Sequence, residues 1–225
     1  VGIGDGDVKL KNVSVKGNTI VKGGGPNSIT LEDSSLPHLT ISKDGVRVVA
    51  AGSTSVQVTQ LASGAALVAI ETTGSGFETI MITQEIPPGA TISLEGDFST
   101  LTMQANINLE LHGTIDELNI SQDVDDAVVY LEETSRVNTL NIDGSARING
   151  EGKIETANIN ANNVVIEPVP ATTVVAPGMT ASVGGKELQE GTAVAEPPKT
   201  EERGSGDSDG GGSGDSGGSY DPPLG

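Results

Sequence analysis

The sequence contains no cysteine and no tryptophan, and aromatic residues make up only 2% of its 225 residues. Without cysteine the chain can form neither a disulfide nor a thiolate metal site, and it has no thiol nucleophile. No apolar run approaches the roughly 20 residues that a membrane-spanning helix needs, so we predict no membrane insertion. Basic residues are also scarce, because 12 Lys and Arg stand against 31 Asp and Glu and the net charge is −19. Such an acidic surface repels phosphate backbones, so we predict no nucleic-acid partner.

Helical periodicity is missing as well, because no stretch sustains apolar residues at the i, i+3, i+4 and i+7 spacing. Between residues 8 and 167, apolar and polar residues alternate in short runs, which indicates β-strands. A longer pattern, apolar-x-x-apolar-x-apolar, recurs at intervals of 17 to 26 residues. Its eight copies begin at Leu10, Leu36, Ser53 (a weaker copy), Phe77, Phe98, Ile115, Val137 and Ile154. A second short strand precedes most copies.

A repeat of this length predicts a solenoid, because one unit cannot bury its apolar side alone and must stack on its neighbours. We predict an all-β fold, a right-handed parallel β-helix of roughly eight coils. The last two apolar positions of each copy should face one continuous core, with Phe77 and Phe98 also inward. The expected core residues are Val13, Val15, Leu39, Ile41, Val56, Val58, Ile80, Ile82, Leu101, Met103, Leu118, Ile120, Leu140, Ile142 and Ile159. A β-sandwich is the alternative, but it does not need one strand pattern to recur in every coil.

We divide the chain into three parts: the parallel β-helix (residues 1–167), a C-terminal cap (168–195) and a flexible Gly/Ser/Asp-rich linker or tail (196–225). Pro168 and Pro170 remove hydrogen-bond donors where the regular pattern stops, and a cap would cover the last open edge. The tail has almost no side chain able to pack, so its composition predicts disorder. Val1 and Ile3 fit an earlier coil and no initiator Met is present, so we expect the polypeptide to continue upstream.

Four segments resemble a bacterial module: GDGDVKLKNVSVKGNTIVKGGGPNSITLEDS, VRVVAAGSTSV, ANINANNVVIEP and VVAPGMTASVGGK. They are similar to the β-helical repeats in cell-surface proteins of Gram-positive bacteria that carry S-layer-homology anchors. The resemblance covers about residues 1–190. It implies an exported, extracellular protein at the cell surface or in the cell wall, with flanking modules on the same polypeptide. It brings no catalytic residues, and the anchor modules themselves are absent from this sequence.

Polar residues beside the inward positions form the most regular candidate site, which we call the Thr/Asn face. It comprises Ser55, Thr79, Thr100, Thr102, Asn119, Thr139, Asn141, Thr156 and Asn158. Such a face is a candidate for weak contact with cell-wall or extracellular polysaccharide. The strand propensity of Thr and the stacking of Asn amides explain the same residues without a ligand. Ice binding is a more distant alternative, because unequal repeats and the charges of Glu117 and Asp143 disfavour a lattice match.

Asp123, Asp125 and Asp126 are the candidate metal ligands, because closely spaced carboxylates in a loop suit calcium. Asp5 with Asp7 and Asp207 with Asp209 form smaller acidic pairs. None of these clusters completes an EF-hand loop or repeats with the coil. We therefore predict no cofactor, with calcium as the one ion to consider.

Catalytic patterns are weak. Residues 51–185 contain 17 acidic residues but only three basic ones, Arg136, Arg147 and Lys153. His38 and His112 stand alone, and a strand end would point Glu132 and Glu133 apart. Sugar-cleaving clefts also rely on aromatic platforms, and this chain has no Trp. We therefore predict a non-catalytic rigid stalk or display module, with an accessory or catalytic module of a polysaccharide-degrading lyase or hydrolase as the alternative.

Overall fold

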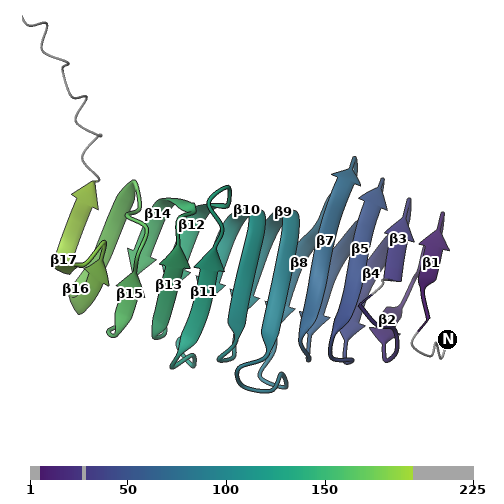
Figure 1. The fold of residues 1–225 in the computed structure, drawn as a ribbon, viewed down its shortest axis with the longest axis horizontal. Helices are drawn as coiled ribbons and strands as arrows, with labels where there is room; N and C mark the ends of the chain where they lie inside the picture. Colours follow the sequence, from purple (N-terminus) through teal and green to yellow (C-terminus); the bar gives the residue numbers. More distant parts are fainter. Residues whose placement is uncertain (1–5, 27–28, 195–225) are drawn as a thin grey trace, which may run out of the picture. The chain divides into compact units, whose positions relative to one another are not determined.

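The computed structural model describes residues 6–26 and 29–194, and every regular element in this part of the chain is a β-strand. The strands form a parallel β-solenoid of about nine turns, which confirms the predicted fold class (Figure 1). Three predictions lie outside the described residues: the earlier coil at Val1 and Ile3, the acidic pairs that include Asp5 and Asp207, and the tail at 196–225. None of the residues in 6–26 and 29–194 forms a helix long and apolar enough to cross a membrane.

Two parallel stacks of strands make up the solenoid, and each turn contributes one strand to each stack. The first stack contains β1 (Val8–Lys11), β3 (Ile29–Glu32), β5 (Val46–Gly52), β7 (Ala65–Thr72), the starts of β9 (Thr91–Met103) and β10 (Asn108–Ile120), β11 (Ala127–Leu131), β13 (Ala146–Gly150), β15 (Val164–Ile166) and the end of β16 (Thr172–Val183). The second stack contains β2 (Asn18–Val21), β4 (Ser35–Ile41), β6 (Ser55–Leu61), β8 (Gly76–Ile82), the ends of β9 and β10, β12 (Arg136–Ile142), β14 (Lys153–Ile159) and the start of β16. Both stacks are visible in Figure 1.

The C-terminal end differs from the other turns in strand direction. β17 (Lys186–Val194) pairs antiparallel with β16, whereas the other strand pairs of the described residues are parallel. β16 itself continues both stacks, because Val175 pairs with Ile159 and Val183 pairs with Ile166. Parallel stacking therefore extends beyond residue 167, and the antiparallel strand β17 follows it.

The core is continuous and lies between the two stacks, where inward side chains form columns along the solenoid axis. Identical inward positions pair from turn to turn, as in the column Ile41, Leu61, Ile82, Met103, Ile120, Ile142, Ile159 and Val175. All expected core residues from Leu39 onward are buried in a single cluster, with the exception of Val58. Phe77 and Phe98 are also inward, and their rings stack at 6.2 Å between centroids with 23° between planes. Burial of stacked apolar side chains is the main stabilising contribution to this fold.

Two copies of the repeat have a different register in the structure from the predicted one. Val56 pairs with Leu36 and Phe77, so the weak copy begins at Val56 and not at Ser53. Its next inward residue is the fully buried Thr59, and Val58 points outward beside Thr79. The prediction for Val58 was wrong because a polar residue occupies the inward position.

The prediction for the first copy was wrong for the same reason, because Thr19 occupies an inward position there. Leu10 belongs to the first stack, where it pairs with Leu31. The second stack has Thr19 and Val21 opposite Leu39 and Ile41. Val15 is half-buried against the edge of the core, and Val13 lies outside the core cluster.

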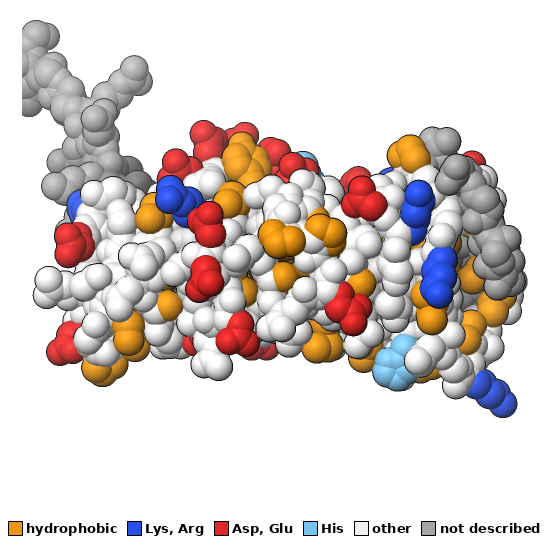
Figure 2. Space-filling view, turned by 90° about the horizontal axis from the view of Figure 1, so that it is seen from below, with side chains coloured by type: hydrophobic (Ala, Val, Ile, Leu, Met, Phe, Trp, Pro, Cys, Tyr) orange, Lys and Arg blue, Asp and Glu red, His pale blue; other side chains and the backbone are white. Residues whose placement is uncertain are grey.

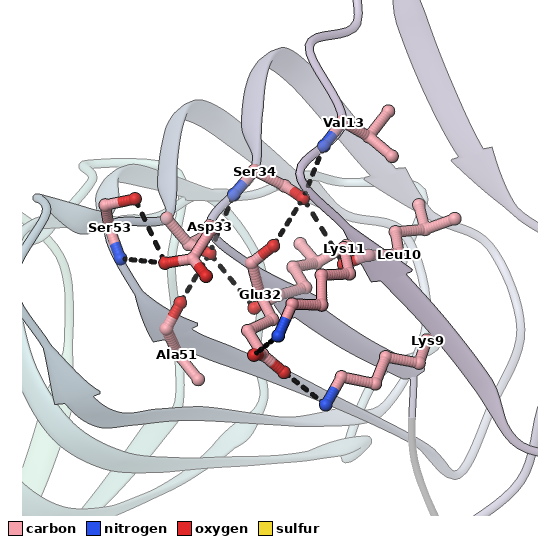
Figure 3. A network of polar contacts seen from close by, with 11 residues as sticks. Lys9, Leu10, Lys11, Val13, Glu32, Asp33, Ser34, Ala51 and Ser53 are labelled. Carbon is pink, nitrogen blue, oxygen red and sulfur yellow. Dashed lines mark hydrogen bonds and ion pairs between the residues drawn. The ribbon is translucent and has the colours of Figure 1, made fainter.

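The chain turns sharply from the first stack to the second at one corner of every coil. In β9 and β10 this corner contains Gly96 and Gly113, with φ angles of 111° and 153°. In the N-terminal coils, buried hydroxyls occupy the corner instead. Ser34 Oγ donates to the Glu32 carbonyl at 2.8 Å and accepts from the Val13 amide at 3.2 Å (Figure 3). These bonds satisfy backbone groups that the turn removes from the strand ladders.

Candidate binding surfaces

The outer face of the second stack gathers most of the predicted Thr/Asn face. Pairing from turn to turn produces two adjacent columns: Thr79, Thr100, Glu117, Thr139, Thr156 and Thr172 in one, and Met81, Thr102, Asn119, Asn141, Asn158 and Val174 in the other. Eight of the nine predicted residues therefore share one face, and all eight are half-buried. Ser55 lies apart, in a column with Ser35 and Gly76, and its hydroxyl donates to Glu78 at 2.8 Å.

The asparagine column is a hydrogen-bonded amide ladder. Asn158 Nδ2 donates to Asn141 Oδ1 at 2.8 Å, and Asn141 Nδ2 donates to Asn119 Oδ1, also at 2.8 Å. Asn141 Nδ2 also lies 3.2 Å from Glu117 Oε1. These amides connect three successive turns, so much of their hydrogen-bonding capacity is used within the protein. No side-chain hydrogen bond joins the neighbouring hydroxyls of Thr79, Thr100, Thr139 and Thr156 to the described residues.

The three candidate calcium ligands lie in the turn between β10 and β11, and all three side chains are exposed. The amides of Asp125 and Asp126 donate to Asn106 Oδ1 at 2.9 and 3.2 Å. The Asp126 carboxylate is 3.9 Å from Arg147 Nε. Across the described part of the chain, no group of three or more His, Asp or Glu side chains is arranged to hold a metal ion. Asn106 and Arg147 therefore contact this turn, and the carboxylates of Asp123, Asp125 and Asp126 do not converge on one point.

Two carboxyl groups among the described residues have a lowered pKa. Hydrogen bonds from Lys11 and Lys9, together with their charges, lower the pKa of Glu32 to about 2 (Figure 3). Hydrogen bonds from Ser75 and Ser55 lower the pKa of Glu78. Both carboxyls are ionised at neutral pH, so neither can donate a proton as a general acid. His38 and His112 are both exposed, and they lie in different stacks.

The outer face of the first stack contains a feature that sequence reasoning missed. Tyr130 points outward and is 45% exposed, whereas Phe77 and Phe98 are buried. It lies in a column that runs Arg47, Ala66, Ser93, Glu110, Tyr130 and Asn149. The alternation in AVVYL carries the signal, because inward Val129 and Leu131 require Tyr130 to point outward.

A depression of about 510 Å³ lies at the N-terminal end of this column. Its lining includes three residues of the column, Arg47, Ala66 and Ser93, together with Asp44 and Thr91. The turns before β5 and β7 are short, whereas longer connections precede β3 and β9, and Pro26 and Ala90 belong to these. The depression is therefore bordered by the longer loops, with Pro26 and Ala90 among its lining residues.

The geometry defines a class of protein: a parallel β-solenoid with polar outer faces and one exposed aromatic side chain in its described part. No protein-family model matches the sequence, and a search of curated proteins found no match. A solved structure does match, with a TM-score of 0.63 and 25% sequence identity. It is the chitinase ChiW from Paenibacillus sp. str. FPU-7, described as a bacterial cell-surface-expressed multi-modular enzyme machinery. The match covers 84% of this chain but only 16% of the chitinase chain, so this solenoid is similar to one part of a much longer protein.

Proposed function

We propose that this chain is a non-catalytic, rigid module of an exported, multi-modular protein on the surface of a bacterium. In this role it holds flanking modules apart or displays them, and it makes contact with polysaccharide. The likeness to part of a cell-surface chitinase supports the extracellular setting and the flanking modules. The resemblance to β-helical repeats of S-layer-homology proteins supports a Gram-positive cell wall as that setting.

The observation that carries the proposal is the unbroken core. Stacked inward side chains of the turns in residues 29–183 form one buried cluster. Eight steps of about 4.8 Å between turns give the solenoid a length of about 40 Å along its axis. A close-packed column of this kind resists bending, because bending would open gaps between rungs. Rigidity along an axis is the property that a spacer between modules needs.

A catalytic module is the competing proposal, because the similar structure is a chitinase. Glycoside hydrolysis needs two carboxyl groups that face each other across a bond. Glu32 and Glu78 have lowered pKa values, which suits structural ion pairs and hydrogen bonds better than proton donation. Within the described residues, acidic side chains are distributed along the solenoid, as Figure 2 shows for one face.

The test is an activity assay with the full chain on chitin, xylan, alginate, pectin and cell-wall glycan. We expect no release of reducing ends and no unsaturated product. Product release from any of these polysaccharides would overturn the proposal.

A second experiment, a pull-down with cell-wall sacculi in calcium and in a chelator, tests contact with anionic wall polymer. The net charge of −19 predicts that such contact needs a bridging divalent cation.

A further inference from the structure

We propose that the outer face of the first stack is a binding track for a linear polysaccharide that carries no acidic groups. The track follows the column of Arg47, Ala66, Ser93, Glu110, Tyr130 and Asn149 along the solenoid axis. This inference rests on the proposed contact with polysaccharide and assigns it to a different face from the Thr/Asn face.

The column has the geometry of an extended site. Its members pair directly from turn to turn, so their side chains point the same way at each step. Four steps of about 4.8 Å separate Arg47 from Tyr130, a distance of about 19 Å. An extended chain molecule lying along the axis therefore meets one side chain of the column at each turn. A compact ligand would contact only one end.

Tyr130 supplies the stacking surface. Among the described residues it is the one aromatic side chain that reaches the surface, and Glu110 and Asn149 flank it in the column. A tyrosine ring offers an apolar face together with a polar tip, which suits a sugar ring whose faces are apolar and whose edges carry hydroxyls. The carboxylate of Glu110 and the amide of Asn149 are the hydrogen-bonding groups at those edges.

The depression at the other end supplies room and unused hydrogen-bonding groups. Gly64, Ala65 and Ala66 contribute almost no side-chain volume, which opens the depression of about 510 Å³. The Arg47 guanidinium and the Asp44 carboxylate line it, and neither makes a side-chain hydrogen bond or ion pair with the described residues. A ligand rich in hydroxyls can accept from the guanidinium and donate to the carboxylate at once.

The surrounding charge selects against acidic polymers. Glu95 lies diagonally from Glu110, in the next column on the same face, and pairs with His112. Asp44 adds a further carboxylate at the depression, and Arg47 is the one cation in the column. Arg147 is a second guanidinium on this face, in the neighbouring column opposite Val128. A polyanion would still meet the carboxylates of Asp44, Glu95 and Glu110, on a chain whose net charge is −19, so like-charge repulsion opposes its binding.

The test measures binding of the full chain to chitohexaose, cellohexaose and xylohexaose, with oligogalacturonate as the acidic probe, by isothermal titration calorimetry. We expect binding to at least one uncharged oligosaccharide and weaker or no binding to oligogalacturonate. Tyr130→Ala should weaken binding by about tenfold, because a single aromatic anchor carries much of the affinity. Tyr130→Phe should retain it, since the ring is kept. Ala66→Glu should weaken binding by filling the depression and adding a negative charge.

The matched control changes the other face. Thr100→Ala and Thr139→Ala remove outward-facing hydroxyls of the Thr/Asn face and should leave binding unchanged. Loss of affinity in these variants with normal affinity in Tyr130→Ala would overturn the track and assign the contact to the Thr/Asn face. Binding of oligogalacturonate alone, or of no oligosaccharide, would also overturn it. Both results leave the non-catalytic module intact, whereas product release in the activity assay contradicts the module and not the track.

Discussion

A β-carbon placed on Gly113 would lie 2.0 Å from the carbonyl oxygen of Gly96. The two glycines occupy the same corner of successive turns, where β9 and β10 pass from the first stack to the second. Gly96 in turn lies against the Ala69 carbonyl, at 2.3 Å from a β-carbon built on it. The corner is therefore a place where backbones of adjacent turns touch, and only glycine leaves enough room.

Gly113→Ala should destabilise the solenoid by about 2 kcal/mol or more, because it combines a steric overlap with an unfavourable positive φ angle. Urea denaturation measures the change. Gly17→Ala is the control, since no atom lies within 4 Å of its added β-carbon, and it should change stability by under about 0.5 kcal/mol. Equal midpoints for the two variants would show that the corner tolerates a side chain.

Thr59 and Thr54 should respond in opposite ways to replacement by valine. Both are fully buried, but Thr59 Oγ1 has no hydrogen-bond partner, whereas Thr54 Oγ1 donates to the Ala51 carbonyl at 2.7 Å. Thr59→Val should stabilise the protein by about 1 kcal/mol, because it removes an unsatisfied buried hydroxyl. Thr54→Val should cost about 1–3 kcal/mol, because backbone groups lose their partner. Thermal unfolding of both variants decides the matter, and a shift of the same sign in both would contradict it.

Leu118→Ala and Leu140→Ala should each cost about 2–5 kcal/mol. Both side chains are fully buried and pair with each other in adjacent turns, so the rungs cannot collapse around the cavity. Thr100→Ala, on the outer face, should cost under about 1 kcal/mol. Chemical denaturation of the three variants measures these differences. Similar losses in all three would mean that inward and outward faces contribute equally.

Glu32 should make stability depend on pH below about 4.5. Lys11 and Lys9 lower its folded-state pKa to about 2 from an ordinary value of 4.5, so between these values the unfolded state binds more protons. The stabilisation is present above pH 4.5 and is lost as pH falls through the folded pKa. The stability difference between wild type and Glu32→Gln should therefore shrink from pH 6 to pH 2. A stability difference that stays constant over this range would argue against the pairing of Glu32 with the two lysines. At neutral pH, added salt should also reduce the stability difference between wild type and Glu32→Gln.

The repeat predicted the register from Phe77 to Ile159 because an apolar residue occupies every inward position of the repeated pattern there, including the small Ala157. The misplaced or uncounted turns share one cause, a threonine at the middle inward position. Thr19 pairs with Leu39, Thr59 with Leu39 and Ile80, and Thr173 with Ala157, so all three threonines belong to one inward column. Threonine has nearly the shape of valine, so a solenoid core accepts a few of them, but a pattern of apolar letters does not register them.

The Thr/Asn face was predictable for the same reason that the core was, since side chains alternate along a strand and repeat from turn to turn. The sequence does not reveal that Asn119, Asn141 and Asn158 bond to one another, because this depends on amide orientation across rungs. Tyr130 was visible as a rare aromatic residue. Its place in line with Arg47 was not visible, because the segment between them contains connections of different lengths.

The sequence by itself determined the all-β solenoid, the parallel stacking of its turns and the alternation of inward and outward side chains. These properties follow from local periodicity, which each turn repeats regardless of its loops. Only the tertiary structure decided which outward side chains form a common column, where a depression opens between two longer loops, and where Gly96 and Gly113 touch. Repeats of 17 to 26 residues allow many strand registers between successive turns. The register adopted depends on how the connections accommodate their extra residues and on which side chains then fill the shared core.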